Sequence, residues 1–277
     1  MEKLITTTQA AEIVGVGVSS IKRWADEELI RTVRTPGGHR RLDLDDLLSF
    51  IARGNESNTA TPAKNALVQK KAEDQDWAEI FLRSDHHSLM SNLLAARSRL
   101  GSWAKVATVV GGGLHEVGLR WRAGTISIYE ERIASQRLAT ALASVHYSMP
   151  QSPNSRVCLL ACAEGELHTL GLSLLRLVLS ESGWSSLWIG EHTPMTEICK
   201  TVDASDVDMV AISATTSFPD PVLLVEQQHT IVDTCRRRDV SLVFGGHGAW
   251  ANDLGYGTVI RDFEAFGQLA RSLNAPN

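Results

Sequence analysis

The chain has 277 residues, of which 43% are apolar, and it carries a formal net charge of −5. This length allows about two or three compact units with real cores, and no apolar run reaches the roughly eighteen residues that would predict a membrane-spanning helix. The first residues lack the basic and then apolar profile of a signal peptide, and the four cysteines lie in or beside apolar runs. We therefore expect a cytoplasmic protein without a disulfide framework.

The first 53 residues hold eight basic and eight acidic side chains, so the negative charge belongs to the rest of the chain. A helical pattern runs through Ala10 and Val14, glycines at 15 and 17 break it, and a second helix is expected from Val18. Helix, glycine-containing turn and helix form the helix-turn-helix pattern. The apolar side chains of the second helix share one face, which leaves its polar face free to enter a major groove.

The segment Thr35-Pro36-Gly37-Gly38-His39-Arg40-Arg41 predicts a hairpin tip between two short strands, with a third helix over 44–51. Together with Trp24 it resembles the winged helix-turn-helix of the MerR and excisionase-like group. The resemblance implies that the second helix approaches bases and the wing binds the DNA backbone. The residues expected to contact DNA are Ser19, Lys22, Arg23, Arg34, His39, Arg40 and Arg41. A small helical module that binds protein is the alternative.

Residues 54–74 are polar and aperiodic, which predicts a flexible linker between residues 1–53 and the rest. Helical periodicity over 75–150 then predicts a four-helix bundle. The expected helices are 77–83, 86–101, 103–120 and 127–149. Three consecutive glycines at 111–113 are costly inside the third helix. Either that helix is interrupted, or another element packs very close to it.

Residues 151–277 alternate between strand and helix patterns, which predicts a parallel sheet with helices on both faces. The expected strands are 156–162, 185–190, 208–213, 240–245 and 257–260, and the expected helices are 167–182, 194–203, 221–236 and 262–273. The fold class is therefore α/β multidomain: a winged helix-turn-helix, a four-helix bundle cap and a Rossmann-like domain.

His168 follows the first of these strands, at the edge of a parallel sheet where ligands bind. Its imidazole can ligate a metal, and Glu166 can accept a hydrogen bond from the other ring nitrogen and so fix the tautomer. Taken alone, such a residue is more often an ordinary loop histidine. Two later strand ends add hydroxyls, at Ser213 and Thr215, and a glycine pair, Gly245–Gly246.

These three elements resemble the signature of cobalamin-binding domains that hold the cofactor base-off and His-on: Asp/Glu-x-His-x-x-Gly, Ser-x-Leu/Thr and Gly-Gly. The resemblance implies that His168 is the lower axial ligand of cobalt and that Glu166 orients it. Ser213 and Thr215 would hydrogen-bond the buried nucleotide tail. The glycines of the signature, which allow close approach, are Gly171, Gly245 and Gly246.

Trp121 and Glu131, with nine residues between them, resemble the Trp-x9-Glu-His motif of the helical cap over cobalamin in CarH/LitR-type light-responsive regulators. Arg132 stands where that motif has histidine, and Arg122 stands where the best-known light sensors have the upper histidine ligand. A guanidinium is a poor metal ligand, so these arginines would instead bind anionic groups. The alternative is that both lie on exposed helix faces. His115 is a candidate replacement ligand.

The resulting hypothesis is a transcription regulator that binds operator DNA and a corrinoid, such as adenosylcobalamin used as a light sensor. The state of the ligand would alter association of its copies and DNA affinity. The alternatives are the same architecture sensing haem or a bilin, a sensor without light, and a corrinoid-carrying enzyme subunit. We expect no enzyme, because the sequence offers no nucleophile–base pair and no phosphate-binding glycine loop. Operator sequence, oligomeric state and direction of regulation do not follow from the residues.

Overall fold

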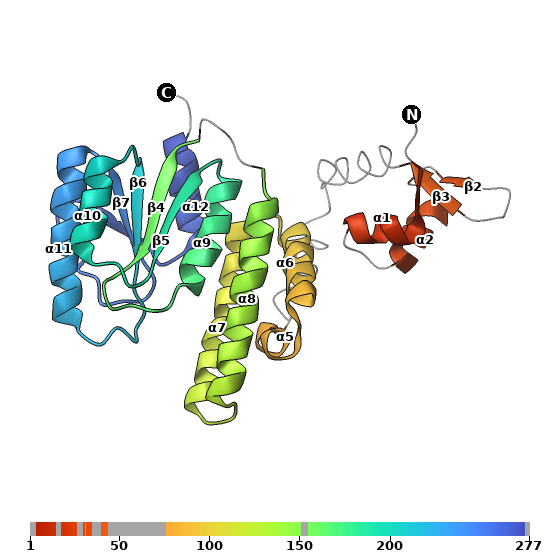
Figure 1. Ribbon diagram of the computed structural model, residues 1–277, viewed down its shortest axis with the longest axis horizontal. Coiled ribbons are helices and arrows are strands. Elements are labelled where there is room, and N and C mark those ends of the chain that lie inside the picture. Colours follow the sequence, from red (N-terminus) through yellow and green to blue (C-terminus); the bar gives the residue numbers. More distant parts are fainter. Residues whose placement is uncertain are drawn as a thin grey trace, which may run out of the picture. The chain divides into compact units, whose positions relative to one another are not determined.

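The computed structural model describes residues 4–14, 18–26, 30, 32–34, 40–43, 76–150 and 155–274. They belong to two compact units, residues 1–72 and 73–277 (Figure 1). The expected helix over 44–51, the linker 54–74 and the wing tip with His39 lie outside the described residues. Within the described ranges, no helix is long and apolar enough to cross a membrane.

The first unit contains a helix-turn-helix beside a small sheet. Its elements are β1 (Leu4–Thr6), α1 (Thr7–Val14), α2 (Val18–Asp26), β2 (Thr32–Arg34) and β3 (Arg40–Asp43). The three strands pair antiparallel in the order β1-β3-β2, and Arg34 is opposite Arg40 at the end of the expected hairpin. Ile21 and Ala25 of α2 are buried against Leu42, so the apolar face of α2 anchors the helix as expected. Strand β1 was not predicted.

Four helices open the second unit: α5 (Trp77–Arg83), α6 (His86–Leu100), α7 (Trp103–Arg122) and α8 (Ile128–Ser148). Each begins after a side-chain cap that accepts a hydrogen bond from a backbone N–H of the first turn. The caps are Asp76, Asp85, Ser102 and Ser127. The expected helix breaks at Gly101 and Gly124 both have positive φ, of 84° and 71°, a conformation that glycine adopts without steric cost.

The three glycines do not interrupt α7. A Cβ at Gly113 would collide with Trp77 Cβ and would lie 2.9 Å from Phe81 Cε2, whereas a Cβ at Gly112 would meet nothing. Of the two explanations for these glycines, close packing is therefore the correct one: α5 lies directly against α7 at Gly113.

The sheet is parallel throughout, with strand order β5-β4-β6-β7-β8. Its strands are β4 (Val157–Cys162), β5 (Ser185–Gly190), β6 (Met209–Ser213), β7 (Ser241–Gly245) and β8 (Thr258–Val259). The helices are α9 (Leu170–Glu181), α10 (Met195–Ala204), α11 (Pro221–Arg238) and α12 (Phe263–Asn274). Helices α10 and α11 cover one face and α9 and α12 the other (Figure 1). The predicted Rossmann-like fold is confirmed.

Strand order places a crevice beside β4. The chain leaves β4 toward β5 on one side, while β6, β7 and β8 lie on the other. Ligands of open parallel sheets bind at such a switch point, outside the carboxyl ends of the strands. The loop after β4 carries His168, and the loop after β6 carries Thr215, so the two loops with candidate residues flank this crevice.

The bundle packs on the α9 and α12 face of the sheet (Figure 1). Glu181, the last residue of α9, accepts a hydrogen bond from Arg97 Nε (2.7 Å) and another from the backbone N–H of Trp103 (2.9 Å). One carboxylate therefore holds the end of α6 and the start of α7 to the sheet. The boundary predicted at residue 150 falls inside this unit and stays a prediction.

Candidate functional site

A buried carboxylate organises the loop after β4. Glu166 is 2% exposed. Its Oε1 accepts hydrogen bonds from the backbone N–H of Leu167 (2.9 Å) and His168 (3.0 Å), and from His168 Nδ1 (2.5 Å). Its Oε2 accepts from the backbone N–H of Thr215 (2.7 Å) and from the Thr215 hydroxyl (2.8 Å). These bonds keep residues 167–169 in a loop, so α9 begins at Leu170 and not at the expected residue 167.

The same hydrogen bonds set the charge of the pair. Burial alone would raise the pKa of Glu166, but the hydrogen bonds from His168 and Thr215 outweigh it and lower the pKa to about 2. In return, the hydrogen bond to Glu166 raises the pKa of His168 against the opposing effect of burial. An ionised carboxylate that accepts a hydrogen bond from Nδ1 holds a proton on Nδ1 and leaves Nε2 as the nitrogen that can bind another partner.

The imidazole of His168 points away from the protein interior. Its side chain is 62% exposed, and within the described residues Nε2 has no hydrogen-bond partner. An imidazole that is held at Nδ1 by a carboxylate and open at Nε2 is the arrangement of metal-ligating histidines. The site therefore fits an external metal centre that brings its own equatorial ligands. No group of three or more His, Cys, Asp or Glu side chains that could hold a bare ion lies in the described ranges.

The ends of β6 and β7 leave space beside this loop. Gly246 has φ 73°, and a Cβ there would collide with the carbonyl oxygen of Ala214, so only glycine fits. Ser213 is buried under it. A cavity of about 200 Å³ adjoins these residues and is lined by Thr215, Thr216, Phe218, Pro221, Leu224, His247 and Ala249. A cavity in this place can receive a narrow ligand arm at the strand ends.

Two of the expected site residues gain a structural context. The Thr215 hydroxyl donates to Glu166, so it supports the carboxylate that holds the imidazole, and its contact with a nucleotide tail stays a prediction. Gly171 lies in the first turn of α9, and a Cβ there would meet nothing within 4 Å. The protein itself therefore does not require glycine at 171, and open space lies in front of it. His192 is exposed in the loop after β5.

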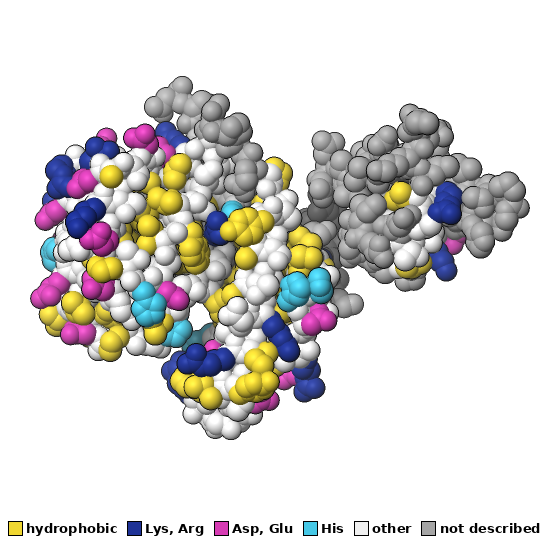
Figure 2. Space-filling view, viewed as in Figure 1, with side chains coloured by type: hydrophobic (Ala, Val, Ile, Leu, Met, Phe, Trp, Pro, Cys, Tyr) yellow, Lys and Arg dark blue, Asp and Glu magenta, His cyan; other side chains and the backbone are white. Residues whose placement is uncertain are grey.

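The residues predicted to form the cap side of the site lie at the hairpin end of α7 and α8. Trp121 is 46% exposed, and Leu119 and Ile128 are also exposed. Figure 2 shows this end standing clear of the sheet domain, with a notch between them that histidine and acidic side chains border. Glu131 on α8 is near enough to His168 for its charge to help raise the pKa of that histidine. Glu131 therefore lies on the side of the bundle that faces His168.

The arginines that replace the expected histidines are both exposed. In the described part of the chain, neither Arg122 nor Arg132 makes a hydrogen bond or ion pair. The acids that could have neutralised them are engaged elsewhere: Glu130 forms a capping box with Ser127, and Glu131 accepts from Ser135. His115 is exposed on α7.

The residues expected to contact DNA are only partly described. Lys22 is exposed on α2 and Arg41 is half-buried on β3, and the backbones of Arg34 and Arg40 pair as the base of the hairpin. Side chains of Ser19, Arg23, Arg34 and Arg40, like His39, lie outside what the structure describes. Their DNA contacts stay predictions.

Comparison with known proteins agrees with this arrangement. Residues 156–266 match the B12 binding domain family, and residues 4–55 match a helix-turn-helix domain family. The chain thus combines a helix-turn-helix domain with a B12 binding domain.

The chain is similar to the HTH-type transcriptional repressor CarH of Myxococcus xanthus, with 26% identity over 238 residues that cover 75% of this chain and 78% of the relative. It is also similar to the dimethylamine corrinoid protein of Methanosarcina barkeri, with 21% identity over 65% of this chain and 87% of that protein. The solved structure of the M. barkeri monomethylamine corrinoid protein shares the fold, with a TM-score of 0.55, 14% identity, and coverage of 73% and 99% of the two chains. The predicted resemblance to CarH-like regulators is confirmed, and the haem or bilin alternative receives no support.

Proposed function

We propose that this protein is a cytoplasmic transcription regulator that senses a corrinoid. One observation carries the proposal: an exposed imidazole, His168, is held by a buried carboxylate at the switch point of a B12 binding domain, in a chain that also has a helix-turn-helix domain. A corrinoid-carrying enzyme subunit needs the first feature but has no use for the second.

His168 Nε2 is the atom proposed to ligate cobalt, and Glu166, held in turn by Thr215, engages Nδ1 and orients the ring so that Nε2 is free for the metal. Ser213, Gly245 and Gly246 are proposed to border the nucleotide tail, and Trp121 to cover the upper face. Adenosylcobalamin, when bound, would supply a light-sensitive cobalt–carbon bond. Because Arg122 and Arg132 cannot ligate a metal, any second protein ligand to cobalt would have to come from another residue, such as His115.

The first experiment is an absorption titration of the full chain with adenosylcobalamin in the dark, followed by illumination. We expect a bound corrinoid spectrum of the base-off, His-on type. His168→Ala should weaken binding strongly, and its DNA binding without corrinoid should match that of the unaltered chain. Equal corrinoid affinity in His168→Ala would exclude this site. A bound spectrum that light does not change would point to a corrinoid sensor without photochemistry.

The second candidate is a corrinoid carrier of a methyltransferase system, which the similarity to dimethylamine corrinoid proteins favours. DNA binding separates the two. A regulator should bind a fragment from upstream of its own gene with an affinity that falls steeply as salt rises, because phosphate contacts release counterions. A carrier should show no such binding at any salt concentration.

Regulation is proposed to act through association of copies. Two or more tethered helix-turn-helix domains raise each other's effective concentration at an operator, so a ligand that changes association changes DNA affinity. Repression is the expected direction by analogy with CarH. Light scattering with and without adenosylcobalamin tests the coupling, and an unchanged mass in both states would contradict it.

A further inference from the structure

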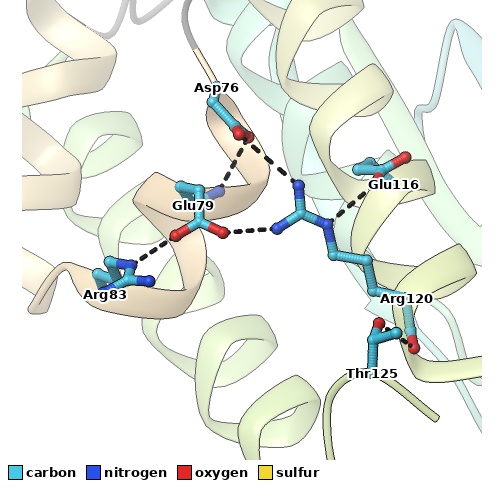
Figure 3. Close-up of polar contacts among 6 residues, drawn as sticks. All are labelled: Asp76, Glu79, Arg83, Glu116, Arg120 and Thr125. Atoms are coloured by element: carbon cyan, nitrogen blue, oxygen red, sulfur yellow. Dashed lines mark hydrogen bonds and ion pairs between the residues drawn. The ribbon is translucent and has the colours of Figure 1, made fainter.

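The last turn of α7 is tied to α5 by one arginine. Arg120 Nε donates to Glu116 Oε1 (2.9 Å), and its Nη1 donates to Glu79 Oε1 (2.7 Å), while Nη2 lies 3.6 Å from Asp76 Oδ2 (Figure 3). Glu79 and Asp76 belong to the start of α5, so three carboxylates from two helices surround a single guanidinium. The Arg120 side chain is 25% exposed, and it is the most enclosed member of the cluster.

The backbone of the same residue holds the turn that follows. The carbonyl of Arg120 accepts hydrogen bonds from the backbone N–H of Thr125 (3.0 Å) and from the Thr125 hydroxyl (2.9 Å). Gly124 closes the turn by donating to the carbonyl of Trp121 (3.0 Å). Arg120 therefore fixes the helix end through its side chain and the α7–α8 turn through its main chain.

The apolar contact between α5 and α7 lies farther back along α7, at Gly113. An open cavity of about 670 Å³ separates the start of α5 from the turn, and its lining residues are Glu79, Leu82, Arg83, Arg120, Thr125, Ile126 and Glu130. The tryptophan that follows Arg120 in the chain is nearly half exposed. With little packing of its own, Trp121 takes its position from the helix backbone to which Arg120 is attached.

We propose that Arg120 is the positioning residue of the cap: it aligns the last turn of α7 so that Trp121 covers the candidate corrinoid site. Successive helical residues point about 100° apart, so anchoring Arg120 toward α5 directs Trp121 to a different side of the helix. Exposed ion pairs add little to global stability, so the network acts on the position of the helix end. This inference rests on the proposed function.

A double-mutant cycle tests the inference on the full chain, with the dissociation constant of adenosylcobalamin as the readout. Arg120→Gln should weaken binding about two- to fivefold in the unaltered chain, and it should have no effect in a Trp121→Ala background, because the residue acts through Trp121. Arg83→Gln is the matched control. It removes the other partner of Glu79 (2.5 Å) without touching α7, and should leave binding unchanged.

Several outcomes would overturn the inference. Equal weakening by Arg120→Gln in both backgrounds would show that Arg120 acts on the fold and not through Trp121, and unchanged binding in the unaltered background would show that the network positions nothing. If Arg120→Gln does not fold, Glu79→Gln removes only one of the three carboxylates and carries the same cycle. If the unaltered chain binds no corrinoid, the proposed function itself is wrong. A different result would contradict only the role of Arg120: the unaltered chain binds corrinoid, His168→Ala does not bind it, and the double-mutant cycle is additive.

Discussion

Glu166 and Trp121 belong to the two halves of the candidate site, and their surroundings differ sharply. Glu166 is 2% exposed and accepts five hydrogen bonds, whereas Trp121 is 46% exposed and is adjacent to Arg122, which has no partner in the described residues. In the sheet half, the protein itself supplies all five hydrogen bonds that hold Glu166. The cap half offers an apolar surface and charged groups whose contacts the protein does not supply.

This difference fits a sensor. A ligand shifts an equilibrium only by interacting differently with its two states, so one half must hold the ligand while the other half changes upon binding. Elements that move in switching proteins come from the least packed parts of the structure. The hairpin end of α7 and α8 carries exposed apolar side chains, and Arg120 joins it to α5 through Asp76 and Glu79.

The largest effect should come from disrupting the sheet half at Glu166. Leu167 and His168 donate to one oxygen of Glu166, and Thr215 donates to the other. In Glu166→Gln one of these oxygens becomes an NH2 group, which cannot accept a hydrogen bond from the N–H group that faces it. Corrinoid affinity should fall about 10- to 100-fold, as for other partners of metal-ligating histidines. Glu191→Gln is the charge control, since Glu191 also raises the pKa of His168 but is exposed. Equal losses in both variants would mean that only charge matters.

The next effect concerns the scaffold of the cap. Gly113→Ala should lower the free energy of unfolding by about 1–3 kcal/mol, because the added methyl group overpacks the contact of α7 with Trp77 and Phe81. Gly112→Ala, where a Cβ meets nothing, should instead stabilise α7 by about 0.5–1 kcal/mol. Urea unfolding measures both. If Gly113→Ala also stabilises the protein, α5 does not pack closely against α7 in solution, which would contradict the contact that we infer.

The sequence predicted the sheet half of the site better than the cap half, for a physical reason. The Glu166–His168 pair is local, and a strand followed by a loop and a helix predicts where it lies. The bond from Thr215 to Glu166 spans 49 residues, and that from Arg120 to Glu79 spans 41. Such contacts depend on how whole elements pack, so hydrophobic periodicity carries no signal for them.

Helix boundaries show the same limit on a smaller scale. The four bundle helices agree with the predicted ranges within two residues, because capping residues and glycines mark their ends. Strand β1 was missed, since three residues are too few for an alternating pattern and the threonines also suit a helix start. The glycines at 111–113 indicated a close contact, but only the structure identifies α5 as the partner.

A third test measures how stability depends on pH, because a buried histidine lies between the helical bundle and the sheet domain. His146 of α8 is buried and hydrogen-bonded to Ser180 of α9. Burial, with a smaller effect of Arg176, lowers its pKa from 6.5 to about 4. Below pH 6.5 this histidine is protonated in the unfolded chain but stays neutral in the folded chain until the pH approaches 4. Stability is therefore lost as pH falls from 6.5 to 4. Between pH 7 and pH 5 the loss should be about 1–2 kcal/mol.

Thermal unfolding at pH 7, 6 and 5 measures this loss. His146→Gln should flatten the profile, while His229→Gln, which alters an exposed histidine, should keep the unaltered profile. Glu166 does not interfere, because its lowered pKa removes stability only as pH falls from 4.5 to about 2. The raised pKa of His168 acts above pH 6.5 and with the opposite sign, because its stabilising effect is lost as pH rises. It therefore offsets part of the loss between pH 7 and pH 6.5, and the step from pH 6 to pH 5 reports His146 without it. A flat profile in the unaltered chain would mean that His146 is solvated in solution.

The smallest effect should come from the cap half. Trp121→Ala removes an exposed side chain, so thermal stability should hardly change, yet corrinoid affinity should fall by about 1 kcal/mol, or about fivefold, because the apolar contact with the ligand is lost. Leu94→Ala on α6 is the matched control, since Leu94 is 43% exposed and should change neither quantity. A fall in stability would mean that Trp121 is packed in solution, and the contrast with Glu166 would disappear. Unchanged affinity would place the ligand against the sheet half alone, leaving the cap free of any part in sensing.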